Sequence, residues 1–139
     1  MRLGLHVSVL RGPLAAARRA RALGAEAFQL LTYRRRPAAA GGDFRWESPD
    51  PGEAAAFRAE TAGLRVVAHV RYLPFLAAAD PARRARSAAL LERELRFASL
   101  LAAGELVIHL GAYSPGSDAA EGTRLFADGV AEAVRAAGG

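Results

Sequence analysis

The sequence predicts an α/β protein built from four consecutive strand–helix units. Short apolar runs alternate with longer, Ala- and Arg-rich segments along the 139 residues. Each short run is almost continuously apolar, which is typical of parallel strands covered by helices on both faces. The expected order is therefore βαβαβαβα.

The first strand is expected at Arg2–His6. Pro13 stands at a helix start, and the segment Leu14–Leu23 is helical in composition. Gly24 follows where a C-terminal cap belongs. Phe28–Leu31 is the second expected strand.

A second helix start is marked by three residues in the correct order. Asp50 is the N-cap, Pro51 is the first helical residue, and Glu53 is the acid of a capping box. This helix should run to about Ala62, and the third strand, Leu64–Ala68, follows it.

The longest helix is expected from Pro81 to near Leu101. Its apolar residues recur at helical spacing on one face, at Ala88, Leu91, Leu95 and Ala98. Leu106–Ile108 is the fourth strand, and a final helix spans about Asp118–Ala137.

Two architectures fit four such units. One is a small open sheet, and the other is the N-terminal half of a (β/α)₈ TIM barrel, which needs about 250 residues when complete. The length fits half a barrel, so we expect residues 1–139 to be a single domain truncated after the fourth βα unit.

Composition narrows the class of protein. There is no cysteine, which excludes disulfides and thiolate metal sites, and no apolar run approaches the roughly 18 residues of a membrane span. We expect a cytoplasmic protein without a membrane partner. The net charge of +5 suits a polyanion, although all 19 cationic residues are Arg, which also fits a GC-rich genome.

Two histidines close two consecutive apolar runs. His69 follows the third strand and His109 follows the fourth. Parallel strands place their carboxyl ends at one edge of a sheet, where α/β proteins bind ligands and metals. The pair could hold zinc, or each ring could simply bond to a loop carbonyl. His6 ends the first strand and could orient the site or contact substrate.

Two loops carry further candidate binding residues. Arg34, Arg35 and Arg36 lie in the Pro- and Gly-rich loop of residues 32–49 and could bind phosphates, or form a solvated charge run. Tyr72 and Leu73 follow His69 closely and could wedge between bases, or pack against the next helix.

An ordered set of segments resembles the N-terminal half of the endonuclease IV family, the zinc-dependent apurinic/apyrimidinic endonucleases of base-excision repair. The similar segments are Gly4–Ser8, Ala27–Thr32, Ala68–Leu73, the helix around Glu94, and Val107–Gly111. In this family Pro-Gly-Ser usually follows the second histidine, whereas here the residues are Leu110, Gly111 and Ala112.

The resemblance implies particular roles. His69 and His109 would be ligands of one Zn²⁺ in a cluster of three, and Arg36, Tyr72 and Leu73 would contact duplex DNA at an abasic site. His6 would not bind zinc itself but would help to orient the site. No catalytic residue is assigned, because the remaining family ligands lie downstream of this sequence. The implied activity is hydrolysis of the phosphodiester 5′ to the abasic site.

Two alternatives remain open. One is a sugar isomerase or epimerase barrel, which shares the fold but more often has a carboxylate-rich metal site and aromatic sugar platforms. The other is a non-catalytic half-barrel. An isolated half-barrel exposes two sheet edges, so we expect self-association when the chain is expressed alone.

Overall fold

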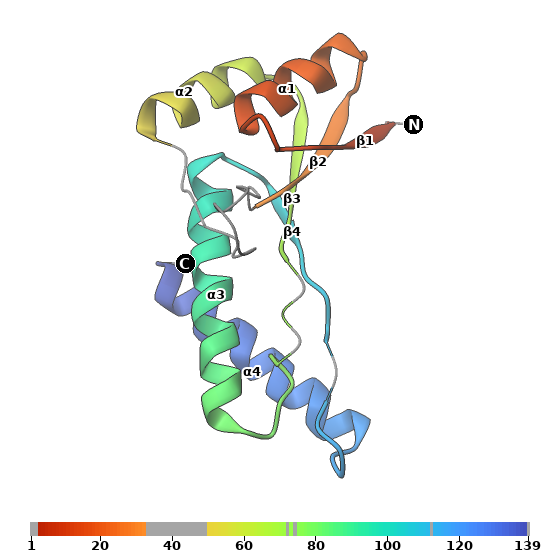
Figure 1. The fold of residues 1–139 in the computed structure, drawn as a ribbon, viewed down its shortest axis with the longest axis vertical. Coiled ribbons are helices and arrows are strands. Elements are labelled where there is room, and N and C mark those ends of the chain that lie inside the picture. The colour runs from red at the N-terminus through yellow and green to blue at the C-terminus, as the bar shows by residue number, and fades with distance from the viewer. Residues whose placement is uncertain (1–2, 33–49, 72, 74, 112, 139) are drawn as a thin grey trace, which may run out of the picture. The chain divides into compact units, whose positions relative to one another are not determined.

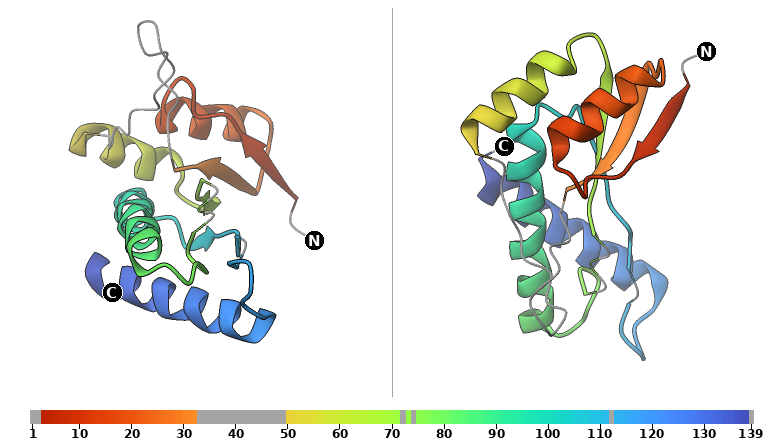
Figure 2. Two further views of the ribbon diagram at one scale, coloured as in Figure 1. Left: turned by 60° about the horizontal axis from the view of Figure 1, so that its bottom comes forward. Right: turned by 45° about the horizontal axis from the view of Figure 1, so that its top comes forward.

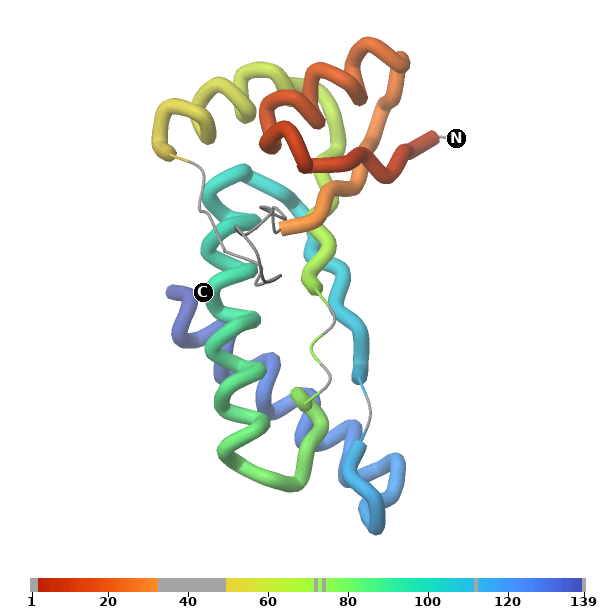
Figure 3. Tube along the Cα trace, viewed as in Figure 1, coloured from red at the N-terminus to blue at the C-terminus, as the bar shows by residue number. Residues whose placement is uncertain are grey.

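The computed structural model describes residues 3–32, 50–71, 73, 75–111 and 113–138. Strands and helices alternate as the sequence predicts, and Figures 1 and 3 let the chain be followed through them in order. The elements are β1 (Gly4–Val7), α1 (Pro13–Ala22), β2 (Ala27–Leu31), α2 (Pro51–Glu60), β3 (Arg65–His69), α3 (Pro81–Leu100), β4 (Glu105–Val107) and α4 (Ala119–Ala137).

The strands form one parallel sheet in the order β1-β2-β3-β4. Each strand pairs with the next along the chain, after a helical or loop connection. His6 lies opposite Gln29, and His69 lies opposite Leu31 and Val107. Since side chains alternate between faces along a strand, this register places His6, Gln29 and His69 on one face of the sheet.

The opposite face of the sheet is covered by α1 and α2, which Figure 2 shows side by side. Phe28 and Leu30 of β2 are buried there with Phe57 of α2. The two phenyl rings lie 6.2 Å apart, centroid to centroid, in a tilted arrangement. The buried alanines of α1, which are Ala16, Ala17 and Ala20, belong to the same core.

Local signals account for the helix ends. The Asp50 carboxylate accepts a hydrogen bond from the Glu53 amide at 2.9 Å, as the predicted N-cap requires. The Asp118 carboxylate accepts one from the Glu121 amide at 2.8 Å at the start of α4. After α1 the chain turns through Gly24 at φ +69°, a conformation in which a β-carbon would be strained.

The chain divides into two compact units. The first comprises Met1–His69 with Phe97–Val107, and the second comprises Val70–Arg96 with Ile108–Gly139. The sheet with α1 and α2 belongs to the first unit, and α4 with most of α3 belongs to the second. The prediction that residues 1–139 form a single domain stays a prediction.

Within the second unit, two glycines of α4 allow close packing. A β-carbon on Gly122 would lie 2.6 Å from the Cβ of Tyr113, and one on Gly129 would lie 3.4 Å from the Cδ2 of Leu76. Leu76 and Leu125 are buried in the same unit. None of the described helices is long and apolar enough to cross a bilayer.

The observed bounds differ from the predicted ones by one or two residues at several ends. β1 continues one residue past His6, and β4 ends at Val107, two residues before His109. One arginine of α1 contacts the end of α2: the Arg21 guanidinium donates to the carbonyl oxygens of Glu60 at 2.6 Å and of Ala62 at 3.1 Å. Arg21 thus ties α1 to the end of α2.

Candidate metal and DNA site

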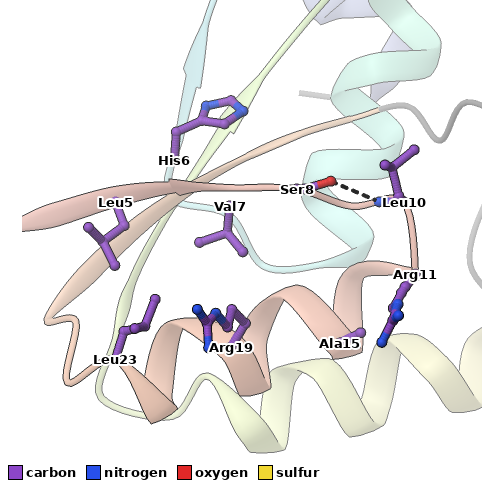
Figure 4. A pocket seen from close by; sticks show the side chains of 9 residues that line it. All are labelled: Leu5, His6, Val7, Ser8, Leu10, Arg11, Ala15, Arg19 and Leu23. Carbon is purple, nitrogen blue, oxygen red and sulfur yellow. Dashed lines mark hydrogen bonds between the residues drawn. The ribbon is translucent and has the colours of Figure 1, made fainter.

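The sheet face opposite α1 and α2 carries a cluster of polar side chains. The Nε2 of Gln29 lies 3.3 Å from the Nδ1 of His6, within hydrogen-bond distance. The His6 and His69 rings are 6.5 Å apart, centroid to centroid, at 77°. Figure 4 shows His6 pointing to the opposite side of β1 from Leu5 and Val7. Gln29 was not predicted as a site residue, although a polar residue between the apolar Phe28 and Leu30 was a usable signal.

His69 is the last residue of β3 and is half-buried, which confirms its predicted place at the carboxyl end of that strand. Its carbonyl oxygen accepts hydrogen bonds from the Thr32 amide at 3.1 Å and from the Thr32 hydroxyl at 3.3 Å. Thr32 is itself buried, at the end of β2. These bonds hold the backbone of His69 against the neighbouring strand and so orient its side chain.

His109 is exposed and belongs to the second unit, whereas His69 belongs to the first. Among the described residues there is no group of three or more histidine, aspartate or glutamate side chains that could hold a metal ion. A zinc site usually needs at least three protein ligands. The described residues therefore do not make a complete zinc site, and shared binding of zinc by His69 and His109 stays a prediction.

The predicted DNA contacts are only partly within the described residues. Arg36 and Tyr72 lie outside them. Leu73 is described and is 1 % exposed. A leucine that enters DNA must be accessible, so the predicted contact of Leu73 would require this side chain to leave its buried position. The role of Leu73 stays a prediction.

A buried ion pair close to His69 in sequence was not foreseen. The Arg71 Nε lies 3.3 Å from the Oε1 of Glu94, whose side chain is 0 % exposed. Burial raises the pKa of the Glu94 carboxyl from 4.5 to about 7, and the positive charge of Arg71 opposes that rise. Glu94 stands three residues after Leu91 and four before Ala98, so helical spacing alone could have placed it on the buried face of α3.

Comparison with known proteins identifies the family. Residues 17–138 match the family model described as the xylose isomerase-like TIM barrel. Together with the four parallel strand–helix units, this match shows that the chain belongs to that family. The predicted fold class is confirmed, since the chain corresponds to about half of a TIM barrel.

The sequence relatives within this family are proteins named probable endonuclease 4. A probable endonuclease 4 of Symbiobacterium thermophilum is 39 % identical over 113 residues, which are 80 % of this chain and 39 % of that protein. A probable endonuclease 4 of Solibacter usitatus is 35 % identical over 136 residues, which are 96 % of this chain and 44 % of that protein. The chain thus spans less than half the length of these relatives.

Solved structures show the same likeness to endonuclease IV. Endonuclease IV from Thermus thermophilus matches with a TM-score of 0.78 and 31 % identity, over 100 % of this chain and 48 % of that one. A D-psicose 3-epimerase matches with a TM-score of 0.67 at 17 % identity, over 99 % of this chain and 49 % of that one. Likeness at that level of identity concerns the fold alone.

Proposed function

We propose that the chain acts in DNA repair as the N-terminal part of an endonuclease IV-type enzyme. Its reaction would be the zinc-dependent hydrolysis of the phosphodiester 5′ to an abasic site in duplex DNA. The observation that carries the proposal is the position of His69 at the carboxyl end of β3, in a chain 31–39 % identical to endonuclease IV proteins over at least 80 % of its length.

Each candidate residue would have a role in binding zinc or DNA. His69 and His109 would supply two nitrogen ligands to one zinc ion, and His6 would help to orient the site. Arg36, Tyr72 and Leu73 would contact the DNA. Because the described residues offer no complete metal site, further ligands would have to come from outside them, and the resemblance to endonuclease IV implies that they lie downstream. We therefore expect the isolated chain to bind damaged DNA without cleaving it.

Zinc binding by the chain depends on His69 in this proposal. We expect His69→Ala to weaken zinc binding by at least about tenfold, the smallest effect usual even for the loss of an outer-shell partner. His109→Ala should weaken it similarly, and Glu92→Gln on α3 is the charge-changing control that should not. Competition for Zn²⁺ with a chromogenic chelator measures all three.

The same proteins test whether the chain binds abasic DNA. Zinc-loaded wild-type chain is titrated into duplex DNA that contains a tetrahydrofuran abasic-site analogue, and into the same duplex without it. Preferential binding of the first duplex without strand cleavage supports the proposal. Cleavage by the wild type that is lost in His69→Ala would show that the site is completed in another way. An equal or undetectable affinity for the two duplexes at low salt would overturn the DNA function.

We also propose that the chain self-associates when it is expressed alone. β1 and β4 are the edge strands of the described sheet, and an apolar groove of about 630 Å³ lies along β1 and α1 (Figure 4). Its exposed leucines are Leu5, Leu10 and Leu23. An unpaired edge beside apolar surface favours pairing with a second copy.

Light scattering coupled to size exclusion measures this association. We expect the wild type to be dimeric or larger, and Leu10→Glu to shift it toward monomer. Val134→Glu on α4, which also replaces an exposed apolar residue but lies in the second unit, is the matched control. A stable wild-type monomer at micromolar concentration would contradict the expectation.

A further inference from the structure

The pair formed by Arg71 and Glu94 joins the segment after β3 to the middle of α3. The guanidinium Nε of Arg71 lies 3.3 Å from the Oε1 of Glu94. The carboxylate is fully buried, whereas a quarter of the Arg71 side chain remains exposed to solvent. Both residues belong to the second unit, so this geometry lies within one compact body.

This arrangement is costly as a purely structural device. The second oxygen of Glu94, Oε2, is buried and has no hydrogen-bond partner among the described residues. A buried carboxylate with an incomplete set of partners stabilises a fold less than an apolar side chain of similar size would. Leu91 and Ala98, its neighbours on the same helical face, are apolar and buried. A charge kept at such a position favours a functional use over a packing one.

The position of Arg71 indicates that use. Arg71 comes two residues after His69 and directly before Tyr72. A guanidinium presents five N–H donors in a planar fork that matches phosphate oxygens, and a carboxylate behind the fork fixes its orientation. In Arg71 the Nε faces Glu94 and the Nη2 is buried, so a phosphate would be met by the quarter of the side chain that is exposed.

We propose that Arg71 is a DNA phosphate-binding residue and that Glu94 is the positioning residue that orients it. The inference rests on the proposed function, because it takes the segment after His69 to face the DNA. It adds a contact to the residues considered above, and it assigns the buried carboxylate of α3 a role in substrate binding.

The number of phosphate contacts can be read from the salt dependence of DNA binding. Each neutralised phosphate contributes about 0.9 to the slope of log K against log salt concentration. We expect Arg71→Gln to bind the abasic duplex about tenfold more weakly at low salt and to lower that slope by about one. The Arg96→Gln variant is the matched control, because Arg96 also pairs with a glutamate of α3, Glu92, at 2.9 Å. Its slope should equal that of the wild type.

Glu94→Gln separates positioning from simple structural support. Removal of a costly buried charge should leave the chain at least as stable at pH 8, as urea unfolding would show, while the affinity for the abasic duplex falls several-fold. A purely structural residue would change affinity only in step with stability. Glu92→Gln is the control on the same helix and should change neither quantity.

The outcomes are distinguishable. If the wild type has no preference for the abasic duplex, the proposed function fails, and this inference fails with it. If the wild type shows the preference but Arg71→Gln keeps the wild-type slope, only the assignment of Arg71 is overturned. If Glu94→Gln binds the duplex more tightly than the wild type, Glu94 withholds Arg71 from DNA, and the positioning role is wrong.

Discussion

Replacement of Phe57 by alanine should lower the free energy of unfolding by about 3–5 kcal/mol, the usual cost of removing a buried phenyl ring. Phe57 is fully buried between α2 and the sheet, and its ring lies against that of Phe28. The core around it includes Ala16, Ala17 and Ala20 of α1, whose small side chains cannot fill the space that a phenyl ring leaves. The cavity would therefore remain open, and we expect an effect near the upper end of that range.

Urea unfolding followed by circular dichroism would measure this loss. Leu3→Ala is the matched control, since Leu3 is also apolar but 68 % exposed and does not line the groove proposed for self-association. Its effect should stay within about 0.5 kcal/mol, as for most surface substitutions. Similar values for the two variants would show that Phe57 does not stand at the centre of the first unit's core.

The stability of the chain should fall as pH rises from about 5 to above 7, because of Glu94. Burial raises the pKa of this carboxyl from 4.5 to about 7 in the folded chain, against the attraction of Arg71. Between these values the folded chain holds a proton that the unfolded chain has released, so each increase in pH favours unfolding. The full change amounts to about 3 kcal/mol, and it is complete once the carboxyl is ionised in both states.

Comparison with Glu94→Gln isolates this contribution from other titrating groups. The difference in free energy of unfolding between variant and wild type should grow in the variant's favour from pH 5 to pH 8. Glu92→Gln, at an exposed ion pair of the same helix, should show no such growth. A difference that is constant with pH would mean that Glu94 titrates near its ordinary value in the folded chain.

Local chemistry explains why the order of elements could be predicted from the sequence. The N-cap Asp50 acts through a hydrogen bond to Glu53, three residues away, and Gly24 acts through its own backbone conformation, so short patterns identify them. The end of β4 was harder. Ile108 continues the apolar run, but whether it joins the strand depends on the pairing partners that β3 offers, and β3 itself ends at His69, opposite Val107.

The site was predictable only in part, for a similar reason. His69 could be placed because an apolar run ends at it. The burial of Leu73 depends on tertiary packing, and the pair of Arg71 and Glu94 joins residues 23 positions apart. An exposed loop and a buried loop look alike in sequence when both contain apolar residues. The helical position of Glu94 was the single local sign that the loop after β3 is buried against α3.

The two glycines of α4 have a consequence for how that helix forms. Glycine in a helix interior is less favourable than alanine by about 1 kcal/mol. Gly122 and Gly129 together therefore make the intrinsic free energy of helix formation in α4 less favourable by about 2 kcal/mol relative to alanines. What they permit is close approach to Tyr113 and Leu76. The helix therefore gains its order largely by docking. Its folding is coupled to that of the loops it touches, and a substitution chosen only to raise helix propensity at position 122 would meet the side chain of Tyr113.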